Sequence, residues 1–319
     1  MASRRNPYFF YTGLKQLAQD LQGDEHVYLG IRPYGFHAGN QLTLYIYPLL
    51  LCQELERLHK RVALKLFVFL NDWEQDGLLG PDLQRYPFNV WPKTTTFQYL
   101  PDQFGCCASM ADHWSPIIFK GIAKIRKDYP LVKVEAIRNS QMKDMPEMKK
   151  TVIDTIQYPE KIYKILKKYS TRDILSKPIV YSLAVCPKCR TTNGHTSYLR
   201  NRIMHICNTC KVVYNEDYNF FNYWLYHKPL AIPRIKIFNI QVCITGADHY
   251  SEGDYTVRKK LFEAFNVRLK NYPKTLYAPT VYASDGQQMG KSRGNTKSLP
   301  DNALYKLAIQ TDNTIIHLP

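Results

Sequence analysis

Hydrophobic positions in the first part of the chain follow two different periods. Over residues 11–21 and about 41–60, apolar side chains recur every three or four positions, which predicts amphipathic helices. The runs HVYLGI, ending at Ile31, and VALKLFVFL, residues 62–70, are short and almost wholly apolar, as expected for buried strands. A glycine-containing turn, RPYGFHAGN, follows the first strand. Strand, turn, helix and strand in this order predict the start of a doubly wound α/β domain.

The later part of the chain predicts a second half of the same sheet after an insertion. The patterns there predict a helix over 115–127, the strand LVKVEAI, one or two helices over 146–169 with a break at Pro159, short strands over 177–214, the strand RIKIFNIQVCIT, a helix over 254–265 and the tail helix NALYKLAI. We therefore expect a Rossmann-like, doubly wound parallel sheet of the α/β class. Its halves occupy residues 1–140 and 231–298, the insertion 141–230, and a short tail 299–319. Ligands in such sheets bind beyond the carboxyl ends of the strands, where the strand order reverses.

Composition adds an expectation about partners. The chain has 319 residues, 45% of them hydrophobic, which suffices for a globular core, and a formal net charge of +16. Such a charge favours polyanions, nucleic acid first, although solvated basic faces would explain it as well. The N-terminus lacks the apolar core of a signal peptide, and LTLYIYPLLLC is too short to span a bilayer. We expect a soluble cytoplasmic protein without a membrane partner.

Four of the eight cysteines form two CxxC pairs, CPKC and CNTC. Two such pairs match the tetrahedral sulfur ligands of zinc better than a disulfide framework. The predicted ligands are Cys186, Cys189, Cys207 and Cys210. Because four protein ligands fill the coordination sphere, the zinc should be structural. The basic segment between the pairs would either contact RNA or form a solvated flap.

Two turns that follow predicted strands carry candidate binding residues. In GIRPYGFHAGN, Gly35 and Gly39 let a ligand approach the backbone, His37 can donate to a phosphate, and Asn40 begins a helix whose amides favour anions. A tight turn with a packed histidine is the alternative. In GADH, Asp248 would accept hydrogen bonds from a ribose or, alternatively, cap a helix.

A third loop, QMGKSRGN at residues 288–295, combines glycines, cations and a hydroxyl group. That composition suits a phosphate chain, but alone it fits a solvated surface turn better. The order of the three segments adds weight to the phosphate interpretation.

HAGN early, GADH late and QMGKS last together resemble the catalytic domain of class I aminoacyl-tRNA synthetases, whose HIGH-type and KMSKS-type motifs embrace ATP. YLPDQFGCCASMADHW, the CxxC pairs and GADHYSEGDYT look like the class I type of lysyl-tRNA synthetase. The resemblance covers roughly residues 25–300. It implies the Rossmann-like fold of that class and binding of ATP with Mg²⁺. It implies catalytic roles for His37, Asn40, Lys291 and Ser292, ATP contacts for Gly35, Gly39, Gly246, Asp248, His249 and Met289, and amino-acid contacts for Gly30, Arg32, Trp224 and His227.

The sequence departs from the family pattern at several points. Gln288 replaces the first lysine of the loop, and Tyr34 stands where a small hydroxyl residue is usual. A pocket lined by Arg32, His227 and Lys228 would repel a lysine ammonium group, so an acidic or neutral amino acid fits more easily. Because little chain follows the loop, we expect no anticodon-binding domain.

Three hypotheses about function follow from these features. The first is an enzyme that activates an amino acid with ATP and transfers it to tRNA or another acceptor. The second is a catalytically degenerate synthetase-like protein that binds tRNA or a partner. The third, a zinc-ribbon protein that binds nucleic acid, explains the cysteines but not the order of the motifs.

Overall fold

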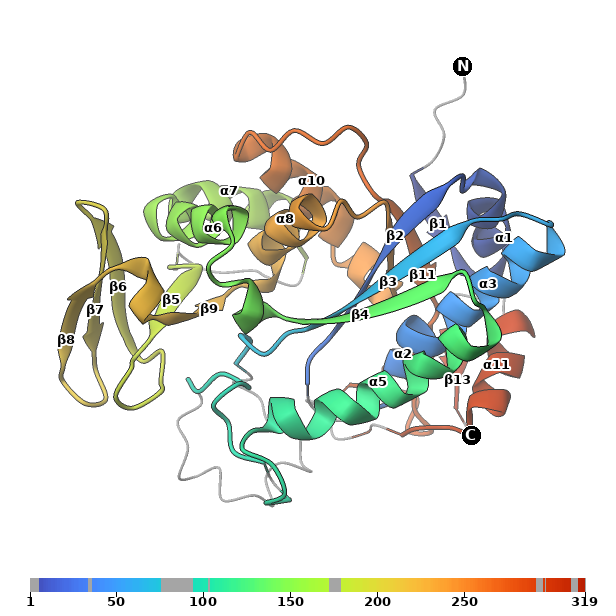
Figure 1. Ribbon diagram of the computed structural model, residues 1–319, viewed down its shortest axis with the longest axis horizontal. Helices are drawn as coiled ribbons and strands as arrows, with labels where there is room; N and C mark the ends of the chain where they lie inside the picture. Colours follow the sequence, from blue (N-terminus) through green and yellow to red (C-terminus); the bar gives the residue numbers. More distant parts are fainter. Residues whose placement is uncertain are drawn as a thin grey trace.

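A parallel six-stranded sheet forms the centre of the molecule in the computed structural model, which describes residues 6–33, 36–75, 94–102, 104–171, 179–290, 295, 297–310 and 315–318 (Figure 1). In spatial order the strands are β1 (Pro7–Phe9), β11 (Lys274–Ala278), β10 (Val242–Gly246), β2 (Asp24–Ile31), β3 (Ala63–Leu70) and β4 (Val132–Arg138). Every neighbouring pair is parallel. The predicted α/β fold class is confirmed.

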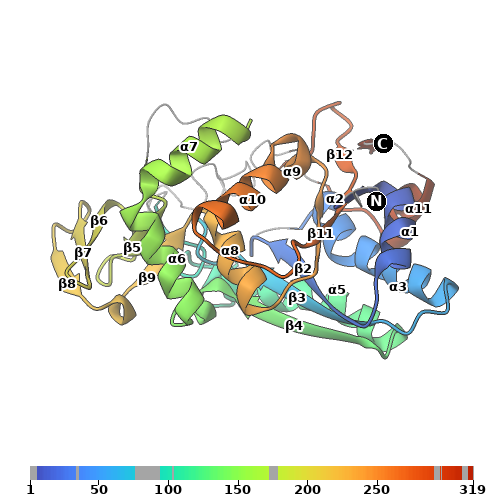
Figure 2. The ribbon, with the colours of Figure 1, turned by 90° about the horizontal axis from the view of Figure 1, so that it is seen from above.

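Each face of the sheet carries its own hydrophobic core, because side chains along a strand alternate between the faces. In β3, Leu64, Leu66 and Leu70 enter one core, whereas Phe67 and Phe69 enter the other. The first core lies under the helices α1 (Phe10–Asp20), α3 (Tyr47–Arg57), α5 (Met110–Asp128) and α11 (Asp301–Gln310). The second lies under α6 (Pro146–Gln157), α7 (Pro159–Tyr169), α8 (His227–Ile237) and α10 (Asp254–Ala264), and Figures 1 and 2 show the two sets on opposite sides of the sheet.

The helix predicted after the first strand is continuous but irregular. It consists of α2 (Ala38–Gln41), a π-helical turn (Leu42–Ile46) and α3. Pro48 has no N–H group to donate to the preceding turn, which accounts for a widened turn just before it. The helix therefore starts at the end of β2 and turns its first residues toward the strand ends.

The inserted subdomain lies at one end of the sheet (Figure 1). Its helices α6 and α7 are separated at Tyr158, so the break predicted at Pro159 is confirmed. An antiparallel pair, β5 (Ser182–Val185) and β9 (Asn222–Leu225), leads to a three-stranded sheet of β6 (Gly194–Leu199), β7 (Arg202–Cys207) and β8 (Val213–Glu216). Two short 3₁₀ turns, Asn139–Met142 and Tyr218–Phe220, complete it.

One predicted strand is wrong in its first part. Of RIKIFNIQVCIT, residues 234–237 belong to α8, and only the end of the run forms β10. Asn239, with φ 46°, lies in the left-handed region and ends the helix. An apolar run does not distinguish a buried helix from a buried strand, since both are apolar on every side when they are fully buried. Helix α8 also crosses residue 230, where we placed a domain boundary.

The last part of the chain returns to the carboxyl ends of the strands. After α9 (Asp248–Ser251) and β11, strand β12 (Thr280–Tyr282) pairs in parallel with β13 (Ile315–His317). The predicted tail helix is confirmed as α11. Among the helices that the structure describes, none has both the length and the apolar character needed to traverse a lipid bilayer.

Candidate active site

A cavity of about 530 Å³ opens at the carboxyl ends of β2 and β10. These strands are neighbours in the sheet, although more than 200 residues separate them in the chain, and β3 lies on the other side of β2. The strand order therefore reverses here, as it does at the ligand sites of doubly wound folds. The volume is within the range of small-molecule sites.

Ten of the predicted site residues line this cavity. They are Gly30, Arg32, His37, Gly39, Asn40, His227, Gly246, Asp248, His249 and Met289. Trp224 is not among the lining residues: it lies on β9 in the inserted subdomain, with its ring edge toward Tyr226. Gly35, Lys291 and Ser292 lie outside the described residues.

The first turn presents polar groups to the cavity. His37 is the N-cap of α2, and its Nδ1 accepts a hydrogen bond from the Gly39 N–H at 3.2 Å. This bond fixes the imidazole ring and identifies Nδ1 as the unprotonated nitrogen, so Nε2 carries a proton that can be donated. Among the residues that the structure describes, the buried Oδ1 of Asn40 has no hydrogen-bond partner. A buried polar atom on a cavity wall suits a ligand that carries a donor.

The segments that flank residues 291–294 and 296 are hydrogen-bonded beside this turn. Before them, Met289 donates its N–H to Val281 O at 2.8 Å, and Gly290 donates to Asn295 Oδ1 at 2.9 Å. After them, Lys297 O accepts from Ala38 N at 2.9 Å. The side chain of Gln41 also binds this second segment, donating to Leu299 O at 2.8 Å and accepting from Leu299 N at 3.1 Å. The flanks of the third motif thus lie against the first motif.

The second turn brings an acidic residue to the same opening. Asp248 is the first residue of α9 and Ala247 holds the N-cap position, so the alternative of an Asp248 helix cap is not what the structure has. Asp248 Oδ2 accepts from Gln288 Nε2 at 3.4 Å. A Cβ at position 246 would lie 2.3 Å from Asp248 Oδ1, so a larger residue there would require this carboxylate to rotate away from its position.

Behind this turn lies a cluster of charges around Asp254. The buried Asp254 accepts a hydrogen bond from the Lys228 ammonium group, and its Oδ2 lies 3.4 Å from His249 Nδ1. Burial alone would raise the pKa of Asp254, but His249, Arg258 and Lys228 hold it well below its usual value. The pKa of His249 is raised: partial burial opposes its charge, but the Asp254 hydrogen bond and the neighbouring Asp248 and Glu252 carboxylates outweigh that effect.

We predicted that positive charges gather on the amino-acid side of the cavity. The structure corrects this prediction, because two carboxylates pair with two of the three cationic residues. Arg32 forms an ion pair with Glu74, and Lys228 is paired with Asp254 and does not line the cavity. Burial would raise the pKa of Glu74, yet Arg32, His227 and Arg234 lower it, so Glu74 is ionised. A lysine ammonium group is therefore not excluded by Arg32, His227 and Lys228.

Several cavity residues are not among those predicted from the sequence. Glu74 and Asn71 follow β3 directly, so their place at a strand end was visible in the sequence. Tyr28, Arg234 and Arg258 had no such indication, because they come from the middle of a strand or a helix, and Asp254 is the first residue of α10. Their convergence depends on the packing of α8 and α10 on the sheet.

The four cysteines of the CxxC pairs converge as predicted. Their Sγ atoms all lie within 4.8 Å of one another, with 3.6 Å between Cys186 and Cys210 and 3.4 Å between Cys189 and Cys207. Sulfur ligands on the corners of a zinc tetrahedron are about 3.8 Å apart. Burial opposes ionisation of Cys207, but the N–H groups of Cys210 and Thr209 and the Cys189 side chain lower its pKa to about 6. The donor set and its spacing fit a structural zinc ion.

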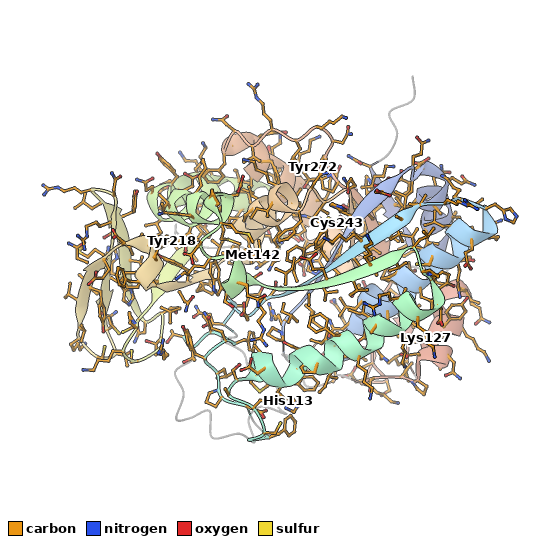
Figure 3. The ribbon with its side chains drawn as sticks, in the orientation of Figure 1. His113, Lys127, Met142, Tyr218, Cys243 and Tyr272 are labelled. Atoms are coloured by element: carbon orange, nitrogen blue, oxygen red, sulfur yellow. The ribbon has the colours of Figure 1, made fainter. Side chains whose placement is uncertain are left out.

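A second group of potential metal ligands lies at the start of α5, where Figure 3 labels His113. Cys106 Sγ is 3.2 Å from both Asp102 Oδ2 and His113 Nδ1, and Cys107 Sγ is 3.6 Å from Cys106 Sγ. These residues belong to YLPDQFGCCASMADHW, which is not predicted above to bind a metal. Two adjacent cysteines between an aspartate and a histidine are the sequence signal from which this group of ligands could have been predicted.

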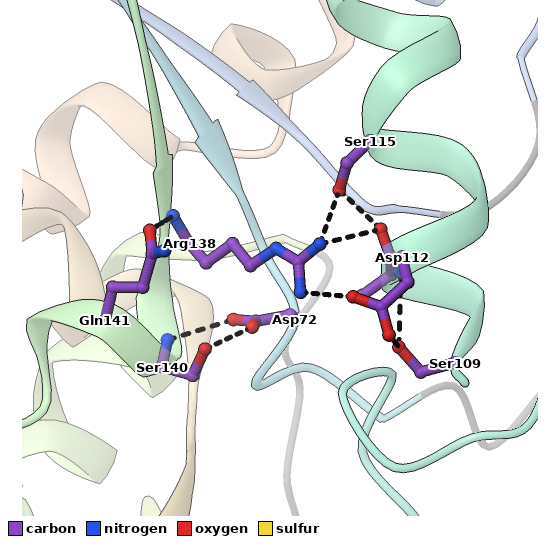
Figure 4. A network of polar contacts seen from close by, with 8 residues as sticks. Asp72, Ser109, Asp112, Ser115, Arg138, Ser140 and Gln141 are labelled. Atoms are coloured by element: carbon purple, nitrogen blue, oxygen red, sulfur yellow. Dashed lines mark hydrogen bonds and ion pairs between the residues drawn. The ribbon is translucent and has the colours of Figure 1, made fainter. Parts of the chain in front are cut away.

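A polar network fixes the first turns of α5, on which His113 lies (Figure 4). Arg138, the last residue of β4, donates to Asp112 Oδ1 at 2.7 Å and to Ser115 Oγ at 3.3 Å. Next to it, the buried Asp72 carboxylate accepts the N–H of Ser140 at 3.0 Å and its hydroxyl group. The network joins the ends of β3 and β4 to the helix that carries the second cluster.

Comparison with known proteins agrees with the order of the motifs. Residues 90–308, more than half of the chain, match the family model described as tRNA synthetases class I (K). The chain belongs to this family of class I tRNA synthetases. No curated protein sequence matches it.

Solved structures with related folds are also tRNA synthetases. Tyrosyl-tRNA synthetase from Archaeoglobus fulgidus, in complex with L-tyrosine, matches with a TM-score of 0.41 and 12% identity over 91% of this chain and 65% of its own. Methionyl-tRNA synthetase from Mycobacterium tuberculosis, in complex with methionyl-adenylate, gives a TM-score of 0.38 and 10% identity over 91% and 63%. A glutamate tRNA ligase from Elizabethkingia meningosepticum gives a TM-score of 0.38 and 12% identity over 85% of this chain and 52% of its own. This chain thus spans about half to two thirds of their lengths, and likeness of this degree assigns no substrate.

Proposed function

We propose that the chain activates an amino acid with ATP, forming an aminoacyl adenylate and releasing pyrophosphate, and transfers the aminoacyl group to tRNA or another acceptor. The observation that carries the proposal is the convergence of three distant segments on one cavity. These are the turn at His37–Asn40, the turn at Gly246–His249 and the flank at Gln288–Gly290. Membership of the class I tRNA synthetases supports the same reaction.

In the proposed reaction a carboxylate oxygen of the amino acid attacks the α-phosphorus of ATP. A new P–O bond forms and the bond to the β-phosphate oxygen breaks, so pyrophosphate leaves with its electron pair. The protein contributes positioning and electrostatic stabilisation. His37 Nε2 and the amide of Asn40 donate to phosphate oxygens, and Asp248 accepts from the ribose. Lys291 and Ser292 bind the leaving pyrophosphate, and Mg²⁺ is held chiefly by the phosphates themselves.

The experiment that tests the proposal is amino-acid-dependent ATP–pyrophosphate exchange with all twenty amino acids. We expect exchange with one amino acid or a closely related pair. Lys291→Ala should reduce it by about 100-fold, because a cation that stabilises transition-state charge is lost. Lys306→Ala, which removes an exposed lysine of α11, is the matched control and should retain full activity. A fully active Lys291→Ala variant would contradict the role of the loop.

A second function is favoured by one specific observation. Gln288 replaces the first lysine of the loop, and its amide is engaged by Asp248. A synthetase-like protein that binds tRNA without chemistry would tolerate this loss of a cation, and its net charge of +16 suits a polyanion. Binding of bulk tRNA without exchange for any amino acid would select this alternative.

A further inference from the structure

His249 lies between the cavity and the buried charges behind it. It belongs to α9, which contacts both the end of β10 and the start of α10 (Figure 2). Its Nδ1 atom is buried and lies 3.4 Å from Asp254 Oδ2 and 4.0 Å from Glu252 Oε2. The side chain as a whole is 36% exposed and lines the cavity. With Nδ1 turned inward, the exposed edge of the ring is the one that carries Nε2.

The charged groups around this imidazole favour its protonated form. Three carboxylates face the ring, those of Asp248 and Glu252 in the same turn and that of Asp254 at the start of α10. Two cations act on the Asp254 carboxylate, Lys228 of α8 and Arg258 of α10. Burial opposes a charge on the ring, but the carboxylates outweigh it and raise its pKa. A proton on the imidazole brings these three carboxylates and two cations to neutrality.

Asp254 is held in place by the elements around it. It is buried at the first position of α10, where Lys228 donates to its Oδ1 and leaves Oδ2 facing His249. The residue before it, Gly253, has a φ of 79°, and a Cβ there would lie 1.9 Å from Tyr169 O at the end of α7. The orientation of the imidazole therefore depends on a carboxylate that α8 anchors and on a turn that α7 packs against.

The opening of the cavity is where a triphosphate would meet negative charge. Gln288 stands at the position of the first lysine of the loop, and its Nε2 donates to Asp248 Oδ2 at 3.4 Å. The turn GADHYSEG adds both Asp248 and Glu252 to the cavity wall. Carboxylates on this wall repel a triphosphate. Within the sequence of this turn, His249 is the residue that can carry a compensating positive charge.

We propose that Asp254 is a positioning residue that holds His249 as an imidazolium ion, and that Nε2 of this ring donates to a phosphate oxygen of ATP in place of the cation that Gln288 does not supply; the proposal rests on the activation function above. The carboxylate behind the ring fixes its proton and its orientation, and the edge in the cavity presents the charge. A hydrogen bond from a charged donor is about twice as strong as one from a neutral donor.

The imidazolium acts by electrostatic stabilisation and keeps its proton throughout the reaction. As the carboxylate oxygen of the amino acid bonds to the α-phosphorus, the bond to the β-phosphate oxygen breaks and its electron pair leaves with pyrophosphate. A fixed cation beside the phosphates stabilises this charge without being consumed. Above the pKa of His249 the ring is neutral, and this stabilisation is lost.

The first test is the pH dependence of ATP–pyrophosphate exchange from pH 6 to pH 9. In the wild type, kcat/KM for ATP should fall as the pH rises through the pKa of His249. His249→Gln should lower kcat/KM by about 10-fold at pH 6 and by less at pH 9, because only the charged ring is missed. Asp254→Asn should shift the decline to lower pH, since the carboxylate that favours the proton is gone. His59→Asn, at an exposed histidine, should keep the wild-type profile.

The second test restores the cation from the loop. Gln288→Lys, added to His249→Gln, should recover most of the lost kcat/KM and remove its decline with pH, because a lysine ammonium group stays charged in this range. Gln287→Lys, the same change at the exposed neighbour, should recover nothing in that background. A lysine at position 288 would not repair a purely structural defect, so recovery assigns the charge. Both positions are partly exposed, and these variants should fold even if Asp254→Asn does not.

Binding of ATP without an amino acid separates failure of this inference from failure of the proposed function. The readout is the Kd of ATP at pH 6 and pH 9, measured by calorimetry for the wild type and His249→Gln. If exchange is absent but ATP binding weakens with pH in the wild type and not in the variant, the imidazolium contact stands and the activation chemistry falls. Exchange with the same pH profile in both proteins, or without recovery by Gln288→Lys, keeps the activation function and overturns the inference. Neither exchange nor ATP binding overturns both.

Discussion

Lys228, near the start of α8, and Asp254, the first residue of α10, form a buried ion pair that joins the two helices behind the cavity. The Lys228 side chain is 1% exposed, so the pair is almost wholly removed from water. Asp254 also faces His249, which lies at the cavity wall. The helices that carry Arg234 and Arg258 are thereby held in a fixed relation.

Asp254→Asn should lower the free energy of unfolding by about 3–5 kcal/mol, because it leaves the Lys228 ammonium group buried without a counter-charge. The double variant Lys228→Met/Asp254→Asn should recover part of that loss, since the buried ammonium group is gone while His249 and Arg258 still lose the carboxylate. Urea denaturation of the two single variants and the double variant measures the coupling. A double variant no more stable than Asp254→Asn would show that the pair is not what stabilises this region.

The contribution of His249 to stability should decrease as the pH rises. Its pKa in the folded protein is raised above the ordinary value of 6.5, so the protonated form is favoured by folding. The stabilisation is complete below about pH 6.5 and is lost as the pH rises through the raised pKa. The Tm difference between wild type and His249→Gln should therefore shrink from pH 6 to pH 9. His59→Asn, which alters an exposed histidine, should show no such trend; a pH-independent difference for His249→Gln would contradict the raised pKa.

Gly246→Ala should weaken ATP binding while the protein still folds. The added Cβ would lie 2.3 Å from Asp248 Oδ1, so the carboxylate must rotate away from the cavity. We expect the KM for ATP in pyrophosphate exchange to rise about 10-fold, as for the loss of one hydrogen bond to a charged group. Gly23→Ala, at a glycine of positive φ with open space around it, should reduce stability slightly and leave the KM unchanged. An unchanged KM for Gly246→Ala would remove Asp248 from the nucleotide site.

Metal analysis of the purified protein should find zinc at the four cysteines of the CxxC pairs and a further metal ion at Asp102, Cys106, Cys107 and His113. Cys189→Ser should lose about one equivalent of zinc, and strands β6, β7 and β8 should become disordered, because the folding free energy of such knuckles comes from the metal. His113→Ala should lose the metal ion of the second group. Cys52→Ser, at a buried cysteine of α3 outside both groups, should retain the full content. Mass spectrometry of the metals and exchange of backbone amides measure the two effects.

The sequence by itself determined the elements and most of the residues at the strand ends. The hydrophobic periods of β2, β3 and α1 are local, and so are the CxxC spacings, because each depends on neighbours a few residues apart. His37, Asn40, Gly246 and Asp248 were identifiable because strand ends in a doubly wound sheet meet at one edge. The sequence was ambiguous where a run was apolar on every side, as in residues 234–245, and there the strand prediction was partly wrong.

Only the tertiary structure decided the charges of the amino-acid side of the cavity. From the sequence, Arg32, His227 and Lys228 formed a cationic wall; the packing of α8 and α10 instead pairs Arg32 with Glu74 and Lys228 with Asp254. The net charge of a site depends on all the ionised groups around it, and the fold brings these groups together from distant parts of the chain. A local sequence pattern therefore does not reveal that net charge. An ion pair acts over a few ångströms, so its existence depends on the packed arrangement of helices and not on the order of residues.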